Sequence, residues 1–222
     1  IPIAQEFNWL RADFSFAIAI QNLAWGIGQP LFSAIAEKFG DRKAIVLGVV
    51  CYAIGLFISA FAITPGQHQF LEILVGFGIA GTGFGVLLAI VGRATPAKHR
   101  SMALGITTAA GSAGQVIGPP VVQMLLNNFV WQEVFVIMAV GILAVMLLLP
   151  FIKAPSDDSS APTTDSMGTV VRNAIKDKTF IFIFIGFFSC GYQLAFITAH
   201  FPAFITEVCS VIEPTSLVRS LG

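Results

Sequence analysis

The chain has 222 residues, of which 56% are hydrophobic and 11% are charged, and its mean hydropathy is +0.85. A soluble domain carries about 25% charged residues, so this composition excludes a water-soluble globular protein with an ordinary polar surface. The formal net charge of zero indicates no nucleic-acid partner, and the long uncharged runs predict a polytopic membrane protein.

Six apolar segments are each long enough to cross a bilayer, which takes about 20 residues. In chain order we expect these spans at 14–36, 44–63, 70–92, 102–126, 134–152 and 179–205. Short polar turns join the first five. The predicted fold is therefore an all-α, polytopic transmembrane helix bundle in contact with the lipid bilayer.

The longest connection, residues 153–178, separates the last two predicted spans. Its first half is rich in Ser, Pro, Thr and Asp and is typical of a flexible linker. Its second half places four apolar residues on one helical face and basic residues elsewhere, which predicts a short amphipathic helix at the membrane surface. We therefore expect three regions: a bundle at 1–152, a linker at 153–178 and a last segment at 179–222.

Lysine and arginine are distributed unequally between the two sets of loops. One side carries only Arg11 and Arg219. The other side carries ten basic residues: Lys38, Arg42, Lys43, Arg93, Lys98, Arg100, Lys153, Arg172, Lys176 and Lys178. Because cytoplasmic loops are enriched in Lys and Arg, this asymmetry places the linker in the cytoplasm and both ends of the chain outside.

Residues 76–81, "GFGIAG", match the spacing of a dinucleotide-binding turn. That fingerprint requires a preceding strand and a following helix N-terminus, whereas these residues lie inside an uncharged run of about 20 residues. Small residues four apart occur here as Gly78 with Thr82 and Gly81 with Gly85. We interpret the stretch as a surface for close packing between membrane helices.

Residues for catalysis or metal binding are not grouped in the sequence. Cys51, Cys190 and Cys209 lack metal-ligand spacing. The spans contain no paired acids, no His set with metal spacing and no nucleophile beside a base. We therefore expect no metal, no cofactor and no enzymatic activity, and a membrane-embedded enzyme or sensor is the alternative that these observations disfavour.

The turn between the first two spans, "SAIAEKFGDRKAIVLG" at 33–48, resembles the signature loop of the major facilitator superfamily, G-x-x-x-D-R-x-G-R-R. Glu37 and Lys38 stand at the family's Asp-Arg pair, and Gly40 matches. Ser33 replaces the first glycine, and Asp41 replaces an arginine and reverses its charge. The resemblance implies a gating element whose acid pairs with neighbouring helix ends, formed here by Glu37, Lys38, Gly40, Asp41, Arg42 and Lys43.

A second stretch, "GITTAAGSAGQVIGPPVVQ" at 105–123, resembles the fifth-helix motif of family antiporters, G-x8-G-x3-G-P. The motif's final glycine pair is absent. Two prolines in sequence predict a kink in this helix. The segment either takes part in coupling or serves as a kinked packing helix, and both interpretations stay open. The matching residues are Gly105, Gly114, Gly118 and Pro119.

In this register the chain corresponds to family helices two to seven, that is, the N-terminal half without its first helix, the linker, and the first helix of the C-terminal half. Residues 7–43 and 186–205 look like bacterial relatives of the monocarboxylate-porter and oxalate/formate branch. That implies transport of a small organic anion across the bacterial inner membrane, with proton coupling or anion exchange. The fifth-helix motif favours an alternative, drug or metabolite efflux.

In the family, helices two, five and seven flank the central pathway. Polar side chains within spans are costly and usually face a cavity or another helix. For each of them the alternative role is an interhelical hydrogen bond. His200 can also carry a proton or cap its helix. Glu72 stands close to where many family members have an arginine. The candidate lining residues are Gln21, Asn22, Gln115, Tyr192, Gln193 and His200.

Overall fold

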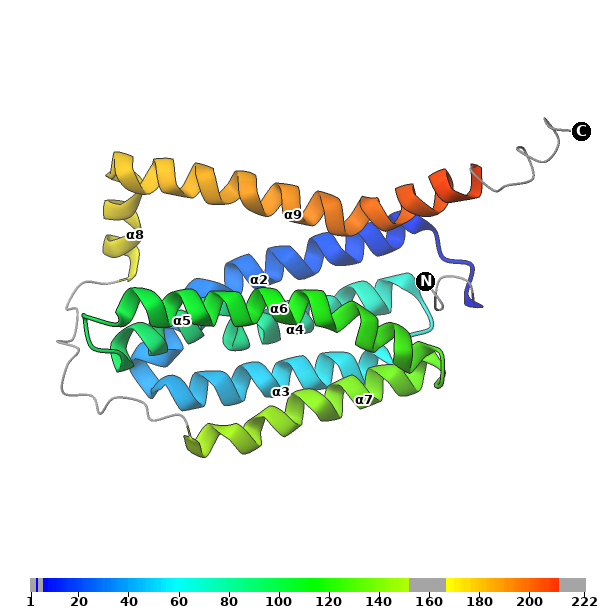
Figure 1. Ribbon diagram of the computed structural model, residues 1–222, viewed down its shortest axis with the longest axis horizontal. Coiled ribbons are helices and arrows are strands. Elements are labelled where there is room, and N and C mark those ends of the chain that lie inside the picture. The colour runs from blue at the N-terminus through cyan, green and yellow to red at the C-terminus, as the bar shows by residue number, and fades with distance from the viewer. Residues whose placement is uncertain (1–2, 4–5, 152–166, 212–222) are drawn as a thin grey trace, which may run out of the picture. The chain divides into compact units, whose positions relative to one another are not determined.

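The computed structural model describes residues 3, 6–151 and 167–211, and all its regular elements there are helices (Figure 1). The chain forms two compact units, Ile1–Ser159 and Ser160–Gly222. The second unit contains α8 (Met167–Lys176) and α9 (Lys178–Val211). The first contains α2 (Arg11–Phe39), α3 (Asp41–Ser59), α4 (Pro65–Thr82), α5 (Phe84–Ala94), α6 (Arg100–Leu126), α7 (Trp131–Ala144) and the 3-10 helix η1 (Val145–Phe151).

The all-α fold predicted from the sequence is confirmed. Within the described residues, four segments are both long and apolar enough to cross a membrane: Asp41–Ser59, Pro65–Ala94, Trp131–Pro150 and Lys178–Ile197. The other two predicted spans coincide with α2 and α6, whose 29 and 27 residues suffice in length. Glycine, glutamine and other polar residues lower their hydropathy. The short helix expected in the second half of the linker is α8.

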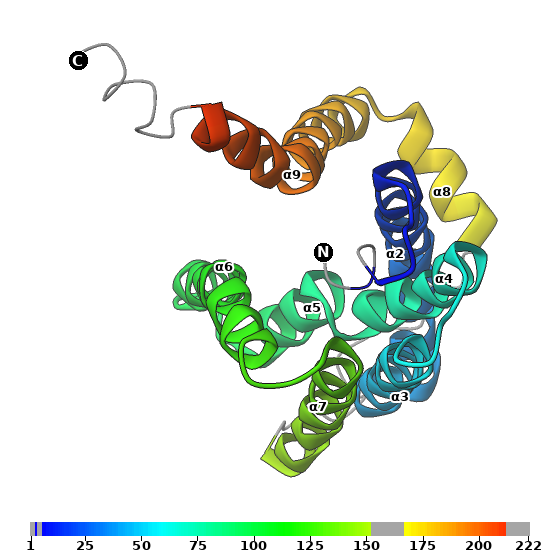
Figure 2. The same cartoon turned by 90° about the vertical axis from the view of Figure 1, so that its right-hand side faces the viewer.

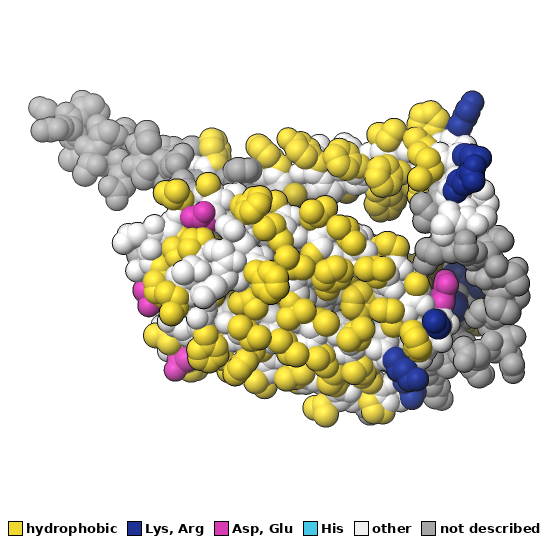
Figure 3. Space-filling model, turned by 180° about the vertical axis from the view of Figure 1, so that it is seen from behind, with side chains coloured by type: hydrophobic (Ala, Val, Ile, Leu, Met, Phe, Trp, Pro, Cys, Tyr) yellow, Lys and Arg dark blue, Asp and Glu magenta, His cyan; other side chains and the backbone are white. Residues whose placement is uncertain are grey.

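Apolar side chains cover much of the outer surface of the first unit (Figure 3). Leu23 on α2 and Phe61 after α3 are 65% and 66% exposed. Continuous apolar patches on this scale mark a surface that contacts membrane or protein rather than water. Since the helices also satisfy their own backbone hydrogen bonds, the unit is built for hydrocarbon surroundings.

Local sequence signals explain where two of the helices begin. Gly40 joins α2 to α3 with φ of 94°, a conformation that glycine adopts without steric cost. Beyond the other end of α3, Thr64 and Gln67 form a capping box at the start of α4. The Thr64 hydroxyl accepts a hydrogen bond from the Gln67 backbone N–H, and the Gln67 side chain accepts one from the Thr64 N–H, both at 3.3 Å.

The centre of the first unit is α4, which packs against both α2 and α3 (Figure 2). A Cβ atom on Gly81 would lie 2.7 Å from the Cα of Gly48 on α3. One on Gly78 would lie 2.5 Å from the Cα of Tyr52. On another side of α4, Gly76 abuts the backbone carbonyl oxygen of Gln21 on α2. The predicted packing role of this glycine-rich stretch is confirmed.

The predicted span at 70–92 differs from the structure in its bounds and its continuity. The helix begins earlier, at Pro65, because the capping box fixes its N-terminus. It is then interrupted at Gly83, whose backbone is extended, before α5 begins at Phe84. Together α4 and α5 still make one apolar segment of 30 residues.

A glycine replacement at the α3–α4 contact tests this packing. We expect Gly81→Ala to reduce the free energy of unfolding in detergent micelles by about 1–3 kcal/mol, because the methyl group overpacks the contact with Gly48. Gly141→Ala on α7 is the matched control, since nothing lies within 4 Å of its added Cβ. It should change stability by less than about 0.5 kcal/mol. Equal changes in the free energy of unfolding for the two substitutions would contradict the close contact between α3 and α4.

Candidate functional site

An ion pair joins the start of α3 to the end of α5. The Asp41 Oδ1 atom lies 2.6 Å from Nη2 of Arg93. The Asp41 side chain is 8% exposed and that of Arg93 is 38% exposed. An acid in the first turn of a helix and a base in the last turn each complement the helix dipole, so each residue also suits its own helix.

The ion pair lies where α2 and α5 end and α3 and α6 begin, which we call the basic end. Lys and Arg side chains gather at this end of the first unit (Figure 3). Glu37, Lys38, Arg42 and Lys43 are all exposed there. The Lys38 ammonium nitrogen lies 5.3 Å from the centre of the Phe39 ring.

The buried acid of this loop is therefore Asp41 and not Glu37. The family resemblance assigns the pairing acid to the position of Glu37, four residues earlier. Asp41 stands where the family has an arginine, and in this chain the reversed charge is matched by Arg93. The sequence shows an acid at the start of one helix and a base at the end of another. It does not predict that these two residues, 52 positions apart, lie in contact.

The candidate lining residues are spread over three helices. Gln21 on α2 is half-buried, and Asn22 is exposed and donates to the Ile18 carbonyl of its own helix at 2.8 Å. Gln115 is exposed on α6, which packs against α5 on the side away from α4 (Figure 2). In the second unit, Tyr192 and Gln193 are exposed on α9. The side chain of His200 lies outside the described residues.

The fifth-helix motif does not pack within the described structure. α6 continues as one helix across both prolines, and it has no buried residue. A Cβ atom on Gly105, Gly114 or Gly118 would meet nothing within 4 Å among the described residues. The contact with α5 is instead made at Gly111, which abuts the ring of Phe84. The motif glycines thus make no packing contact among the described residues.

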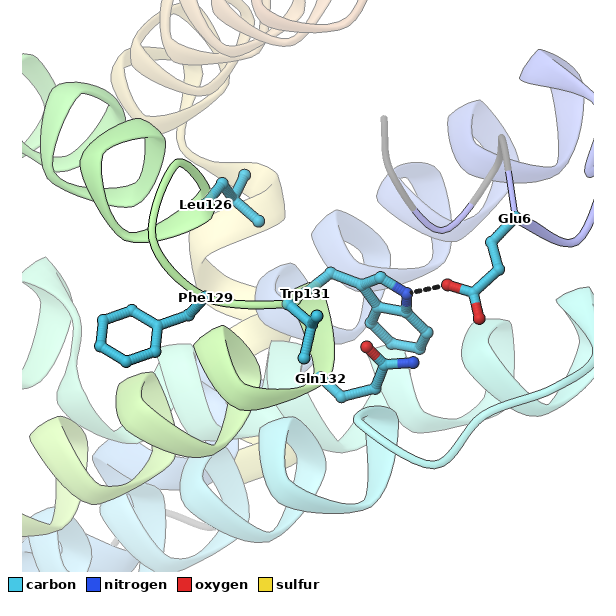
Figure 4. Close-up of a pocket in the computed structure, with 6 residues that line it drawn as sticks. Glu6, Leu126, Phe129, Trp131 and Gln132 are labelled. Carbon is cyan, nitrogen blue, oxygen red and sulfur yellow. Dashed lines mark hydrogen bonds between the residues drawn. The ribbon is translucent and has the colours of Figure 1, made fainter.

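A pocket of about 520 Å³ lies at the end of the first unit opposite the basic end (Figure 4). The Trp131 indole N–H points to Glu6 and donates a hydrogen bond to its carboxylate. None of the candidate lining residues contributes to this pocket, and the carboxylate of Glu6 makes it unfavourable for an anion. It is lined by Glu6, Leu126, Phe129, Val130, Trp131 and Gln132.

Removing one partner of the ion pair should destabilise the first unit. We expect Arg93→Ala to lower the free energy of unfolding by about 1–3 kcal/mol, because the buried Asp41 carboxylate loses its hydrogen-bond partner. The swapped variant, Asp41→Arg with Arg93→Asp, should recover only part of this loss, since each charge then opposes its helix dipole. Lys43→Ala is the exposed control and should have an effect below about 0.5 kcal/mol. An effect of Arg93→Ala no larger than the control's would contradict the assignment.

The chain was compared with known protein families and curated proteins. The model of the Major Facilitator Superfamily matches residues 1–210. An uncharacterized MFS-type transporter of Bacillus subtilis is 29% identical over 213 residues, which cover 90% of this chain and 50% of the relative. The hexuronate transporter of Bacillus subtilis is 25% identical over 216 residues, covering 92% and 48%. Monocarboxylate transporter 13 of Bos taurus is 33% identical over 131 residues, covering 58% and 28%.

The chain thus spans about half the length of the two Bacillus relatives. The family match extends from α2 through most of α9, so it covers both units. It agrees with the helical fold and with the four described segments that are long and apolar enough to cross a membrane. The chain belongs to the Major Facilitator Superfamily, a family of multi-pass membrane proteins that transport small solutes.

Proposed function

We propose that the full-length protein carries a small organic anion across the cell membrane by alternating access, driven by proton symport or by anion exchange. The observation that carries this proposal is the likeness to two transporters whose names specify carboxylate solutes, hexuronate and monocarboxylate. A bacterial cell membrane is the proposed location, since two of the relatives are from Bacillus. The chain then comprises three regions: the bundle at 1–152, the linker at 153–178 and the first helix of a second half at 179–222.

In this proposal the pathway is lined by Gln21, Asn22, Gln115, Tyr192, Gln193 and His200. Asn22, Gln115, Tyr192 and Gln193 are exposed in the described structure, which leaves their amide and hydroxyl groups available to a solute. Amide and hydroxyl groups can donate hydrogen bonds to a carboxylate without adding negative charge. The pocket beside Glu6 is less suitable, because its carboxylate repels an anionic solute.

We place the gate of this transporter at the basic end. Enrichment in Lys and Arg puts that end in the cytoplasm. The Asp41–Arg93 pair is partly exposed on its arginine side, so water can replace the contact at modest cost when helices separate. The hinge at Gly40 lies directly beside the pair, between α2 and α3. Together these features support a contact that forms and breaks between the two states of the transporter.

Uptake by the full-length protein in proteoliposomes tests the function. Radiolabelled lactate, oxalate and glucuronate serve as probes, under either an imposed pH gradient or preloading with unlabelled anion. We expect at least one probe to accumulate above protein-free vesicles. A Gln115→Glu variant should lower that uptake roughly tenfold or more, since a like charge in the pathway costs several kcal/mol.

The matched control is Gln115→Asn, which keeps the amide and should keep most of the uptake. Extrusion of a lipophilic cationic dye without uptake of any anion would favour drug efflux instead. An absence of solute movement under both driving forces would contradict secondary transport.

A further inference from the structure

A buried polar pair lies on the first two turns of α4, at the end of the first unit opposite the basic end. The His68 Nε2 atom is 3.5 Å from Oε1 of Glu72, one helical turn further on. The two side chains are only 7% and 12% exposed. Polar groups this deeply buried in a membrane helix are costly and are retained where they have a function.

Aromatic rings from other parts of the chain enclose the imidazole. The ring centres of Trp9, Phe14 and Phe135 lie 5.9, 5.7 and 6.3 Å from that of His68. Trp9 precedes α2, Phe14 is in its first turns, and Phe135 is on α7. The pair is thus a contact point for three segments that pack around the start of α4.

The charged side chains that the structure describes around the pair provide no fixed counter-charge. Tyr52 faces Glu72 from α3 and lies close enough to interact with its charge. On α2, the Asp13 carboxylate accepts from the Leu10 backbone N–H at 3.1 Å. Glu133 on α7 is exposed, and Glu6 binds Trp131. Among the side chains that the structure describes, no Lys or Arg pairs with Glu72.

One nitrogen of His68 has no role in the pair. Nδ1 is buried without a hydrogen-bond partner among the described residues. A neutral imidazole beside an ionised Glu72 leaves one negative charge in a nearly closed apolar site, which is unfavourable. Binding of one proton to either side chain of the pair removes that net charge.

We propose that His68 and Glu72 form the proton-binding site of the transporter, a proposal that rests on the transport function above and names the group through which protons act. One proton binds from the outer side, is shared between Nε2 and Oε1, and is released to the cytoplasmic side when the transporter opens inward. Its binding neutralises the pair and favours close packing of the Trp9 segment, α2 and α7 on α4. Histidine suits this role because its ordinary titration range includes physiological pH, whereas the arginine of the Asp41–Arg93 pair stays charged.

The first experiment detects the proton without any solute. Tryptophan emission of the full-length protein in lipid nanodiscs is followed as a function of pH, with Trp9 as the reporter because its ring lies against His68. We expect a single transition that is lost in His68→Gln and in Trp9→Phe. Glu72→Gln should move its midpoint to lower pH by about one unit, since a nearby opposite charge shifts a titration by 1–3 units.

The controls are His99→Gln and Glu133→Gln, both exposed in the structure, and neither should move the transition. Circular dichroism and gel filtration establish that each variant is folded. A transition in folded His68→Gln that matches the wild type would overturn the proposal, and so would an unchanged midpoint in folded Glu72→Gln.

The second experiment links the site to transport in the proteoliposome assay. In Glu72→Gln we expect uptake driven by a pH gradient to fall at least tenfold, while exchange of labelled for unlabelled anion continues. Equal pH-driven uptake in wild type and Glu72→Gln would overturn the proposal. If the fluorescence transition follows His68 and Glu72 but the wild type moves no anion, the proton-binding site stands and the proposed anion transport fails.

Discussion

The close approach of α4 to α2 and α3 is the contact on which the rest of the first unit depends. In hydrocarbon the hydrophobic effect does not drive helices together, so they associate through close packing and interhelical polar contacts. Gly81, Gly78 and Gly76 remove the side chains that would keep the backbones of three helices apart. Packed this closely, α4 fixes the positions of α2 and α3, and hence of the loop that joins them at Gly40.

Two polar pairs lie near opposite ends of the segment formed by α4 and α5, and they differ in burial and in chemistry. The pair of Asp41 and Arg93 contains an arginine that stays charged, and it joins helix ends beside the glycine turn at Gly40. The pair of His68 and Glu72 contains a titratable base and lies among aromatic rings from neighbouring segments. With the basic end in the cytoplasm, as we propose, the pair of Asp41 and Arg93 would lie toward the inside and the pair of His68 and Glu72 toward the outside.

Much of the fold could be predicted from the sequence, because membrane helices need long apolar segments and glycine spacing marks where such helices touch. The break at Gly83 and the pairing of Asp41 with Arg93 could not be predicted, since they depend on three-dimensional packing between distant segments. His68 and Glu72 are four residues apart, so their contact on one helix is visible in the sequence. Their burial is not, because the rings that enclose them come from 54 to 67 positions away. The sequence left open whether the motif glycines of α6 serve coupling or packing, and the described residues give Gly105, Gly114 and Gly118 no packing partner.

The central claim is that a bilayer separates the basic end from the end that holds His68 and Glu72. Labelling of single cysteines with a membrane-impermeant maleimide tests it most directly, in intact cells that express the full-length protein with its native cysteines replaced. Gln67→Cys at the start of α4 should react from outside, whereas Lys98→Cys in the turn between α5 and α6 should react only after the membrane is permeabilised. Labelling of Lys98→Cys in intact cells, with Gln67→Cys protected, would contradict the account.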